Sequence, residues 1–419
     1  MIPRTIQPLV TERLQLGGKV IVIYGPRQAG KTTLVSQILG TLPYRVRTVN
    51  ADEIFYRSAL SSQDARQLRD LVDGYDLLFV DEAQRVPDIG INLKILVDQL
   101  PHVRVIVTGS SSLDLASKVR EPLTGRTWTF TLYPIAQCEL AMLYSPLELR
   151  YQLDERLIYG SYPALFSLAG ERIRRDYLHE IVTSYLYKDL LVMGDIRYFD
   201  KLRNLLKLLA HQVGQQVSYT ELGTQLQMSK NTVMAYVDLL EQAFVIFRLK
   251  GFSRNLRKEL TKQDKIYFCD VGVRNALIED LRFPDYRTDM GALWENFVAA
   301  ERMKYLRYVY GSGSLYFWRT QTGAEIDLVE ERDGQLTAYE CKWGKTKARA
   351  PQSFVESYPD SRFYVVTPDN FTEHLAAVAE IPELERRKRL QADTIASIQA
   401  ASATDRLSRD QVHDRDMPA

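Results

Sequence analysis

Eight residues near the start of the chain have the types and the spacing that phosphate binding requires. They read GPRQAGKT and fit the P-loop pattern completely. Gly25 and Gly30 let the backbone fold tightly around an anion, so that main-chain N–H groups point at phosphates. Lys31 adds a positive charge beside the same oxygens, and the Thr32 hydroxyl suits Mg²⁺. The motif predicts an ATP site made of Gly25, Pro26, Arg27, Gln28, Ala29, Gly30, Lys31, Thr32 and Thr33.

Three further candidate catalytic residues follow buried apolar runs. Asp81 and Glu82 come directly after Leu77–Val80. An acidic residue at the end of a buried parallel strand can hold Mg²⁺, which we expect of Asp81, and Glu82 can orient and polarise the attacking water. Burying unpaired carboxylates costs free energy, so a purely structural role is hard to explain and a catalytic role is favoured. Thr108 ends the next apolar run; its hydroxyl either contacts the γ-phosphate or the water, or belongs to a small polar turn.

A sheet must position these residues. Five apolar runs alternate with helical stretches, at residues 20–24, 46–49, 77–80, 103–107 and 127–132. This alternation predicts an α/β fold with a doubly wound parallel sheet. Arg120 and Arg126 lie between the last two runs. Either could act as an arginine finger on a neighbouring subunit's nucleotide in a homo-oligomer, or simply pair with surface acids.

Residues 217–249 predict a helix–turn–helix followed by a strand, as in a winged helix. Ser218 can cap a first helix, and Ser229 can cap a second helix over Lys230–Gln242. Lys230, Asn231 and Thr232 would then lie at the tip that enters a DNA groove. Because winged helices also serve as packing modules, DNA binding and packing both stay open.

A basic stretch follows this segment. It could lie along a phosphate backbone or form a solvated loop. Its cations are Arg248, Lys250, Arg254, Arg257, Lys258, Lys262 and Lys265.

A second possible active site lies further along the chain. Glu295 falls in a helical run, whereas Asp327 and the pair Glu340 and Lys342 fall in two strand-like runs that we expect to form a hairpin. Alternation puts Glu340 and Lys342 on one face of their strand. The carboxylates could hold Mg²⁺ or Mn²⁺, and Lys342 could position or deprotonate a water for phosphodiester hydrolysis. Glu325 could add a ligand or be a surface polar residue.

Composition narrows the class of protein. The chain has 419 residues, is 45% hydrophobic and balances 54 basic against 53 acidic residues, so any nucleic-acid contact needs a local patch. No apolar run is long enough to span a bilayer, and the N-terminus lacks a signal-peptide pattern. Three widely spaced cysteines, Cys138, Cys269 and Cys341, suggest buried thiols of a cytoplasmic protein.

The chain resembles AAA-type P-loop ATPases of bacteria and archaea that carry a C-terminal domain of unknown function related to PD-(D/E)XK nucleases. The runs that carry the resemblance include GPRQAGKTTL, LLFVDEAQRVPD, VTGSSSLDL, LTGRTWTFTLYPIAQCEL, GSYPALF, YLYKDLL, KIYFCDVGVRNAL and GALWENFV. The resemblance extends to about residue 370 and implies a helical lid after the sheet. The expected domains are an ATPase core at 1–145, the lid at 146–210, a winged helix at 211–252, a nuclease-like α/β domain at 253–378 and a charged tail at 379–419.

Three functions fit these observations. The first is Mg²⁺-dependent ATP hydrolysis that drives an action on DNA, with a metal-dependent nuclease-like C-terminal domain. The alternative is an ATP-driven remodeller or switch whose nuclease-like domain is inactive and docks DNA or protein. A third, a regulator that binds nucleotide without turnover, is disfavoured by Asp81 and Glu82.

Overall fold

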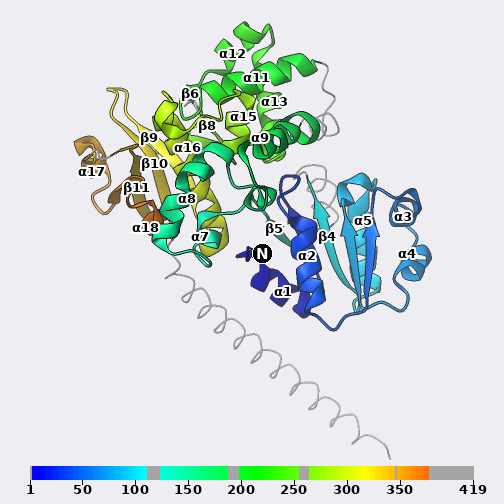
Figure 1. The fold of residues 1–419 in the computed structure, drawn as a ribbon. Helices are drawn as coiled ribbons and strands as arrows, with labels where there is room; N and C mark the ends of the chain where they lie inside the picture. The colour runs from blue at the N-terminus through cyan, green and yellow to red at the C-terminus, as the bar shows by residue number, and fades with distance from the viewer. Residues whose placement is uncertain (1, 111–122, 187–197, 254–263, 345–346, 377–419) are drawn as a thin grey trace, which may run out of the picture. The chain divides into compact units, whose positions relative to one another are not determined.

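The structure is a computed structural model that describes residues 2–110, 123–186, 198–253, 264–344 and 347–376 (Figure 1). These residues belong to one unit that spans residues 1–376. Arg120, the tail predicted at 379–419 and the cations Arg254, Arg257, Lys258 and Lys262 lie outside the described residues.

The first sheet has five parallel strands in the order β2-β3-β4-β1-β5. Alternate residues of β1 enter two separate apolar cores, with Val20 and Val22 in one and Ile21 and Ile23 in the other. Helices therefore cover both faces, and the predicted doubly wound parallel sheet is confirmed. The strands are β1 (Val20–Tyr24), β2 (Val46–Asn50), β3 (Leu77–Asp81), β4 (Arg104–Gly109) and β5 (Thr127–Thr131).

The helices of this first part divide between the two faces of the sheet. Helices α1 (Gln7–Leu16) and α2 (Lys31–Gly40) contribute to one apolar core. The opposite core takes apolar residues from α3 (Ile54–Leu60), α4 (Ala65–Val72) and α5 (Ile89–Gln99). Figure 1 shows α2 and α5 on either side of the strands.

A helical segment follows the first sheet. Its elements are α7 (Gln137–Leu140), α8 (Pro146–Tyr159), α9 (Glu171–Glu180), a π-helical turn (Ile181–Leu186) and α11 (Phe199–His211). Ser145 starts α8 with a capping box, since Ser145 and Glu148 satisfy each other's main-chain N–H groups. None of the described helices is long and apolar enough to cross a membrane.

The two helices predicted in this segment are present as α12 (Tyr219–Leu226) and α13 (Lys230–Gln242). The Ser218 and Ser229 hydroxyls accept main-chain hydrogen bonds in the first turns of these helices, so both predicted caps are confirmed. Three short strands flank the helices: β6 (Gln216–Val217), β7 (Ile246–Gly251) and β8 (Asp264–Phe268).

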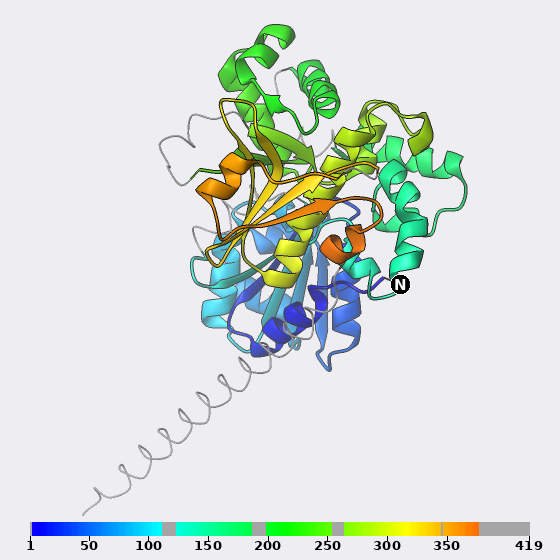
Figure 2. The same ribbon diagram turned by 90° about the vertical axis from the view of Figure 1, so that its left-hand side faces the viewer.

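The second sheet has seven strands in the order β12-β11-β10-β9-β7-β8-β6. Figure 2 shows its C-terminal strands in yellow and orange. Strand β7 pairs with β8 on one side and with β9 on the other, so the sheet continues across residue 252, the predicted boundary between two domains. The predicted hairpin that carries Asp327 and Glu340 is confirmed as β10 and β11. The remaining strands are β9 (Ser314–Arg319), β10 (Glu325–Arg332), β11 (Gln335–Cys341) and β12 (Arg362–Val366).

Helix α16 (Met290–Tyr305) packs against this sheet. Trp294 anchors it, because its side chain is fully buried and its Nε1–H donates to the Val366 carbonyl at 3.0 Å. This anchor fixes the rotation of the helix at the neighbouring Glu295. Shorter helices complete the region: α15 (Val271–Leu277), α17 (Gln352–Ser357) and α18 (Phe371–Leu375).

Candidate functional site

The P-loop connects the end of β1 to the start of α2. Gly25 packs so closely against the backbone at Leu132 that a Cβ atom at position 25 would lie 2.0 Å from the Leu132 carbonyl oxygen. Gly30 has a φ of 93°, in the left-handed region, immediately before the first helical residue. Both glycines are therefore needed for the backbone path that the motif predicts.

Lys31 is buried and reaches back over the loop. Its Nζ donates to the carbonyls of Gly25 and Pro26, each at 2.9 Å. Arg4, which lies outside the P-loop motif, also contacts the loop, since its guanidinium donates to the Ala29 carbonyl at 2.8 Å. Arg4 could not be predicted from the sequence, because the residues it connects are far apart along the chain.

The carboxylate of Asp81 lies between two hydroxyl groups. Thr32 Oγ1 donates to Asp81 Oδ2 at 2.8 Å, and Thr108 Oγ1 donates to Asp81 Oδ1. Strand order explains this arrangement, because β4 lies between β1, which leads to the P-loop, and β3, which ends in Asp81. A hydroxyl and a carboxylate are oxygen ligands that Mg²⁺ accepts, so these residues fit the ion that the motif implies.

Glu82 follows Asp81 in the left-handed conformation, with a φ of 55°. This conformation is unusual for a residue with a side chain and is found preferentially at functional sites. Gln84 Nε2 donates to Glu82 Oε2 and also to Ser110 Oγ at 3.0 Å, which ties Glu82 to the end of β4. Gln84 is not among the predicted site residues, although it lies only two residues beyond Glu82.

A cavity of about 360 Å³ adjoins the first turn of α2. Apolar and aromatic side chains form much of its wall, and Arg4 and Gln37 contribute polar groups. Its lining includes Gly30, Thr33, Leu143, Tyr144, Pro163 and Phe166.

Arg126 lies far from this chain's own P-loop. It precedes β5, whose register pairs Thr127 with Val20 at the start of β1. The P-loop follows the other end of β1, about 16 Å away, because the strand has five residues and rises about 3.3 Å per residue. Arg126 pairs with Asp98 at 2.7 Å and is 40% exposed. An in-trans role stays a prediction.

The C-terminal carboxylates converge, as expected from the hairpin. Continuing the β10–β11 register by one residue puts Asp327 opposite Glu340, on the same face. Asp327 Oδ2 accepts the Cys341 N–H at 2.8 Å. Burial, reinforced by the charges of Glu295 and Glu340, raises the pKa of Asp327 to about 7.

Lys265 lies beside the carboxylate cluster, which consists of Glu295, Glu325, Asp327 and Glu340. Its Nζ is 3.0 Å from Glu295 Oε1 and 2.6 Å from Glu325 Oε1, and its side chain is only 3% exposed. The hydroxyl of Tyr267 also donates to Glu295 Oε1, at 2.6 Å. From the sequence, Lys265 is expected in a basic stretch that lies along a phosphate backbone or forms a solvated loop. That prediction is wrong for Lys265, because the residue is buried and ion-paired.

Arg248, another member of the basic stretch, is also used internally. Its guanidinium pairs with Asp238 at 2.8 Å and with Glu241. Only Lys250 among the described members of the stretch is both exposed and outside these internal ion pairs.

Lys342 lies at the edge of the carboxylate cluster. Its Nζ is 2.7 Å from Glu340 Oε1, so the predicted common face of these two residues is confirmed. Burial would lower the pKa of Lys342, but the hydrogen bond and the charge of Glu340 outweigh it and raise that pKa.

The carboxylate cluster does not fit a divalent cation in this arrangement. Within the described ranges, no three His, Cys, Asp or Glu side chains are placed so that they could hold a metal ion. The Lys265 ammonium instead lies between Glu295 and Glu325. The expectation that Glu295, Asp327 and Glu340 share a metal stays a prediction.

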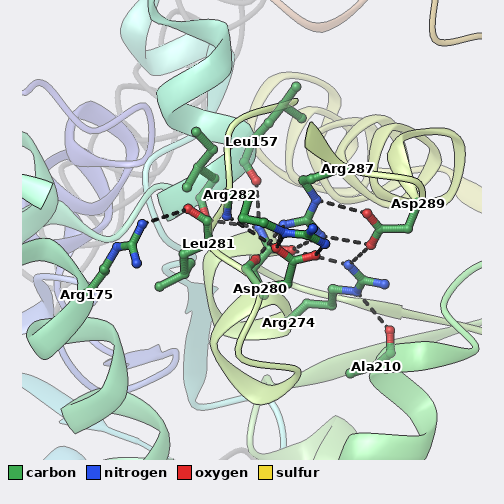
Figure 3. Close-up of polar contacts among 11 residues, drawn as sticks. Leu157, Arg175, Ala210, Arg274, Asp280, Leu281, Arg282, Arg287 and Asp289 are labelled. Carbon is green, nitrogen blue, oxygen red and sulfur yellow. Dashed lines mark hydrogen bonds and ion pairs between the residues drawn. The ribbon is translucent and has the colours of Figure 1, made fainter. Parts of the chain in front are cut away.

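A separate buried ion network positions the start of α16 (Figure 3). Arg274 Nε donates to the Ala210 carbonyl at 2.8 Å, and its guanidinium pairs with Asp289, the residue before the helix. Arg287 pairs with the same carboxylate at 2.8 Å. Although burial opposes it, these two guanidinium groups lower the pKa of Asp289 to about 2. The network thus fixes the helix that carries Glu295.

Three known families match successive parts of the chain. Residues 17–141 match an AAA domain, residues 150–283 match a domain of unknown function (DUF8612), and residues 290–384 match another (DUF4143). The parallel sheet, the P-loop and the AAA match define an AAA-type P-loop protein.

Proteins of similar sequence occur in bacteria and archaea. The uncharacterized protein Rv2008c of Mycobacterium tuberculosis is 30% identical over 358 residues, which cover 83% of this chain and 76% of that protein. The chain belongs to the same family as this protein. The uncharacterized protein MJ1637 of Methanocaldococcus jannaschii is 28% identical over 321 residues, 67% of each chain.

One solved structure that this chain matches in part is the Walker-type ATPase PABY2304 of Pyrococcus abyssi. It is 14% identical, with a TM-score of 0.48, and the match covers 66% of this chain and 96% of that one.

Proposed function

We propose that this protein binds ATP and hydrolyses it in an Mg²⁺-dependent reaction. The observation that carries the proposal is the placement of Asp81, which a P-loop hydroxyl and the Thr108 hydroxyl hold at the mouth of the loop. Mg²⁺ bound by Thr32 and Asp81 would neutralise charge that develops on the β- and γ-phosphate oxygens.

The residues around Asp81 have separate roles in this proposal. Lys31 and the N-terminus of α2 bind phosphate oxygens in the ground state. Glu82 orients the attacking water and accepts its proton, while Gln84 keeps the carboxylate in place. Thr108 positions Asp81.

The cavity beside α2 is the proposed site of the nucleoside. It adjoins Gly30 and Thr33, so a nucleotide could place its phosphates on the loop and its base against Tyr144 or Phe166. Apolar and aromatic walls with a few polar groups are typical of small-molecule sites.

DNA is the proposed target of the helix–turn–helix. The Ser229 cap ends the turn, and Lys230 and Asn231 are exposed at the start of α13, where such helices meet the major groove. With β7 and β8 behind them, the two helices resemble a winged helix. Replacing Lys230 and Asn231 with alanine should remove any effect of DNA on ATP turnover without changing turnover in its absence.

Two roles are candidates for the C-terminal PD-(D/E)XK-like domain. One is metal-dependent cleavage of DNA, which the convergence of Asp327, Glu340 and Lys342 supports. The other is docking of DNA or protein without cleavage. The buried Lys265 favours docking, because its ammonium neutralises carboxylates that a metal would require.

A single assay tests these proposals together. The full-length protein is incubated with ATP, Mg²⁺ or Mn²⁺ and single- or double-stranded DNA, and both phosphate release and strand cleavage are measured. We expect phosphate release without cleavage. Cleavage that is lost in Asp327→Ala or Lys342→Ala would instead support the nuclease role, and absence of phosphate release would contradict the ATPase proposal.

A further inference from the structure

We propose that Lys265 is a built-in cation that takes the place of a divalent metal among the C-terminal carboxylates. The ammonium group of strand β8 would replace the ion, so the cluster keeps its structure with no resident metal. This inference goes beyond the ATPase function, which rests on different residues at the P-loop.

The geometry puts the ammonium where a shared cation would have to be. Glu295 comes from helix α16 and Glu325 from strand β10, and Lys265 Nζ lies within 3.0 Å of a carboxylate oxygen of each. The two carboxylates approach the same nitrogen from different elements. A divalent ion bound by both would therefore compete with the ammonium for the same space.

The Glu295 oxygen that contacts Lys265 already has a second donor. Tyr267, two residues further along β8, donates its hydroxyl to Glu295 Oε1 at 2.6 Å. The backbone also packs closely here, because a Cβ at Gly214 would lie 3.2 Å from the Glu295 carboxylate. This oxygen therefore already contacts two donor groups of the protein and has the backbone close beside it.

The two carboxylates beside Lys265 stabilise its positive charge near neutral pH. Burial by itself would lower the pKa of Lys265, but the charges and hydrogen bonds of Glu295, Glu325 and Asp327 outweigh it and raise that pKa above its ordinary value. An ion that entered the cluster would then meet a full positive charge at short distance, and repulsion would oppose its binding.

Manganese binding to the full-length protein tests this inference. Every protein in the test carries Asp81→Asn, which removes a ligand of the nucleotide-site metal, and no nucleotide is added. Lys265→Ala removes the ammonium and leaves space, whereas Lys265→Met fills most of that space with an apolar side chain. Bound Mn²⁺ is counted by electron paramagnetic resonance.

We expect no stoichiometric Mn²⁺ on the parent or on Lys265→Met. Lys265→Ala should gain one ion per chain, with at least about tenfold tighter binding than the parent, since several carboxylate oxygens then lack a counter-ion. Adding Asp327→Asn to Lys265→Ala should remove most of that gain. If the alanine variant does not fold, Lys265→Gln provides the same test with a shorter, uncharged side chain.

Two results would overturn the inference. One is an ion bound to the parent and lost on Asp327→Asn, which would show that Lys265 and a metal coexist. The other is a folded Lys265→Ala or Lys265→Gln protein that gains no ion. Failure of the ATPase proposal would look different, because it would appear as absent ATP turnover in the wild-type protein and would leave these titrations unchanged.

Discussion

The P-loop and the C-terminal cluster use the same residue types, lysine and carboxylates near strand ends, in opposite ways. At the P-loop, Lys31 donates to main-chain carbonyls and Asp81 accepts from neutral hydroxyls. At the C-terminal cluster, Lys265 is ion-paired with Glu295 and Glu325.

The two sites differ in the source of the positive charge that compensates their carboxylates. Among the described residues, no cationic side chain forms an ion pair with Asp81, so in the proposed function its charge is available to an ion that arrives with the nucleotide. The C-terminal cluster receives a cation from its own chain. Residue types alone therefore do not distinguish a site that binds an ion from a site that is already neutralised.

The largest expected effect is a loss of turnover when the arginine that a neighbouring subunit would supply to the P-loop site is removed. If Arg126 acts there as an arginine finger, Arg126→Ala should lower kcat by about a thousandfold or more. Mixing this variant with Lys31→Ala subunits should restore part of the activity, because each subunit supplies what the other lacks. Asp98→Ala, which removes only the surface partner of Arg126, is the matched control and should leave turnover nearly unchanged.

Turnover that does not depend on protein concentration, from a protein that stays monomeric with ATP, would contradict this in-trans role.

Glu82 should affect chemistry, whereas Lys31 should affect binding. Glu82→Gln keeps the size of the side chain but cannot accept a proton, so kcat should fall by about a hundredfold to ten-thousandfold with nucleotide affinity retained. Lys31→Ala should instead weaken nucleotide binding by about ten- to a hundredfold, since it removes a charged ground-state contact. Nucleotide titrations and phosphate release separate the two effects. A Gln variant with wild-type turnover would exclude Glu82 as the base.

Removing the internal cation of the C-terminal cluster should destabilise the protein. Lys265→Met leaves Glu295 and Glu325 without their buried counter-ion, so the free energy of unfolding should fall by about 3–5 kcal/mol. Lys342→Met is the matched control: Lys342 is 35% exposed, and removing it should cost less than about 1 kcal/mol. Urea unfolding measures both. Equal losses would show that Lys265 is not the counter-ion of the cluster.

The smallest expected effect is a pH dependence from Asp327. Its folded-state pKa of about 7 lies above its ordinary value of 3.8. Its contribution to stability is therefore fully present below about pH 4 and is lost as the pH rises through about 7. Asp327→Asn keeps an acceptor for the Cys341 N–H without the charge. Between pH 5 and pH 8 the variant should gain on the order of 2 kcal/mol in unfolding free energy relative to wild type.

Parallel stability curves for the two proteins across this pH range would contradict the raised pKa of Asp327.

Local features could be predicted from the sequence, because their causes lie within a few residues. The P-loop glycines, the strand that ends in Asp81 and the caps at Ser218 and Ser229 each depend on neighbours along the chain. The β10–β11 hairpin was predictable from alternation for the same reason.

Long-range ion pairs could not be predicted in this way. Lys265 meets Glu295 and Glu325 only after β8, α16 and β10 have come together, and its sequence neighbours indicate nothing more than a basic stretch. Arg4 likewise reaches Glu139, 135 residues away, at 3.0 Å. The carboxylates of the C-terminal cluster were therefore predicted without the lysine that pairs with two of them.

Counting Mn²⁺ ions on the wild-type, full-length protein, with and without a non-hydrolysable ATP analogue, tests the contrast between the two sites most directly. We predict one ion per chain with the analogue, held at Thr32 and Asp81, and none without it, because Lys265 already neutralises the C-terminal carboxylates. An ion bound without nucleotide and lost on Asp327→Asn, or no ion bound even with the analogue, would contradict this account.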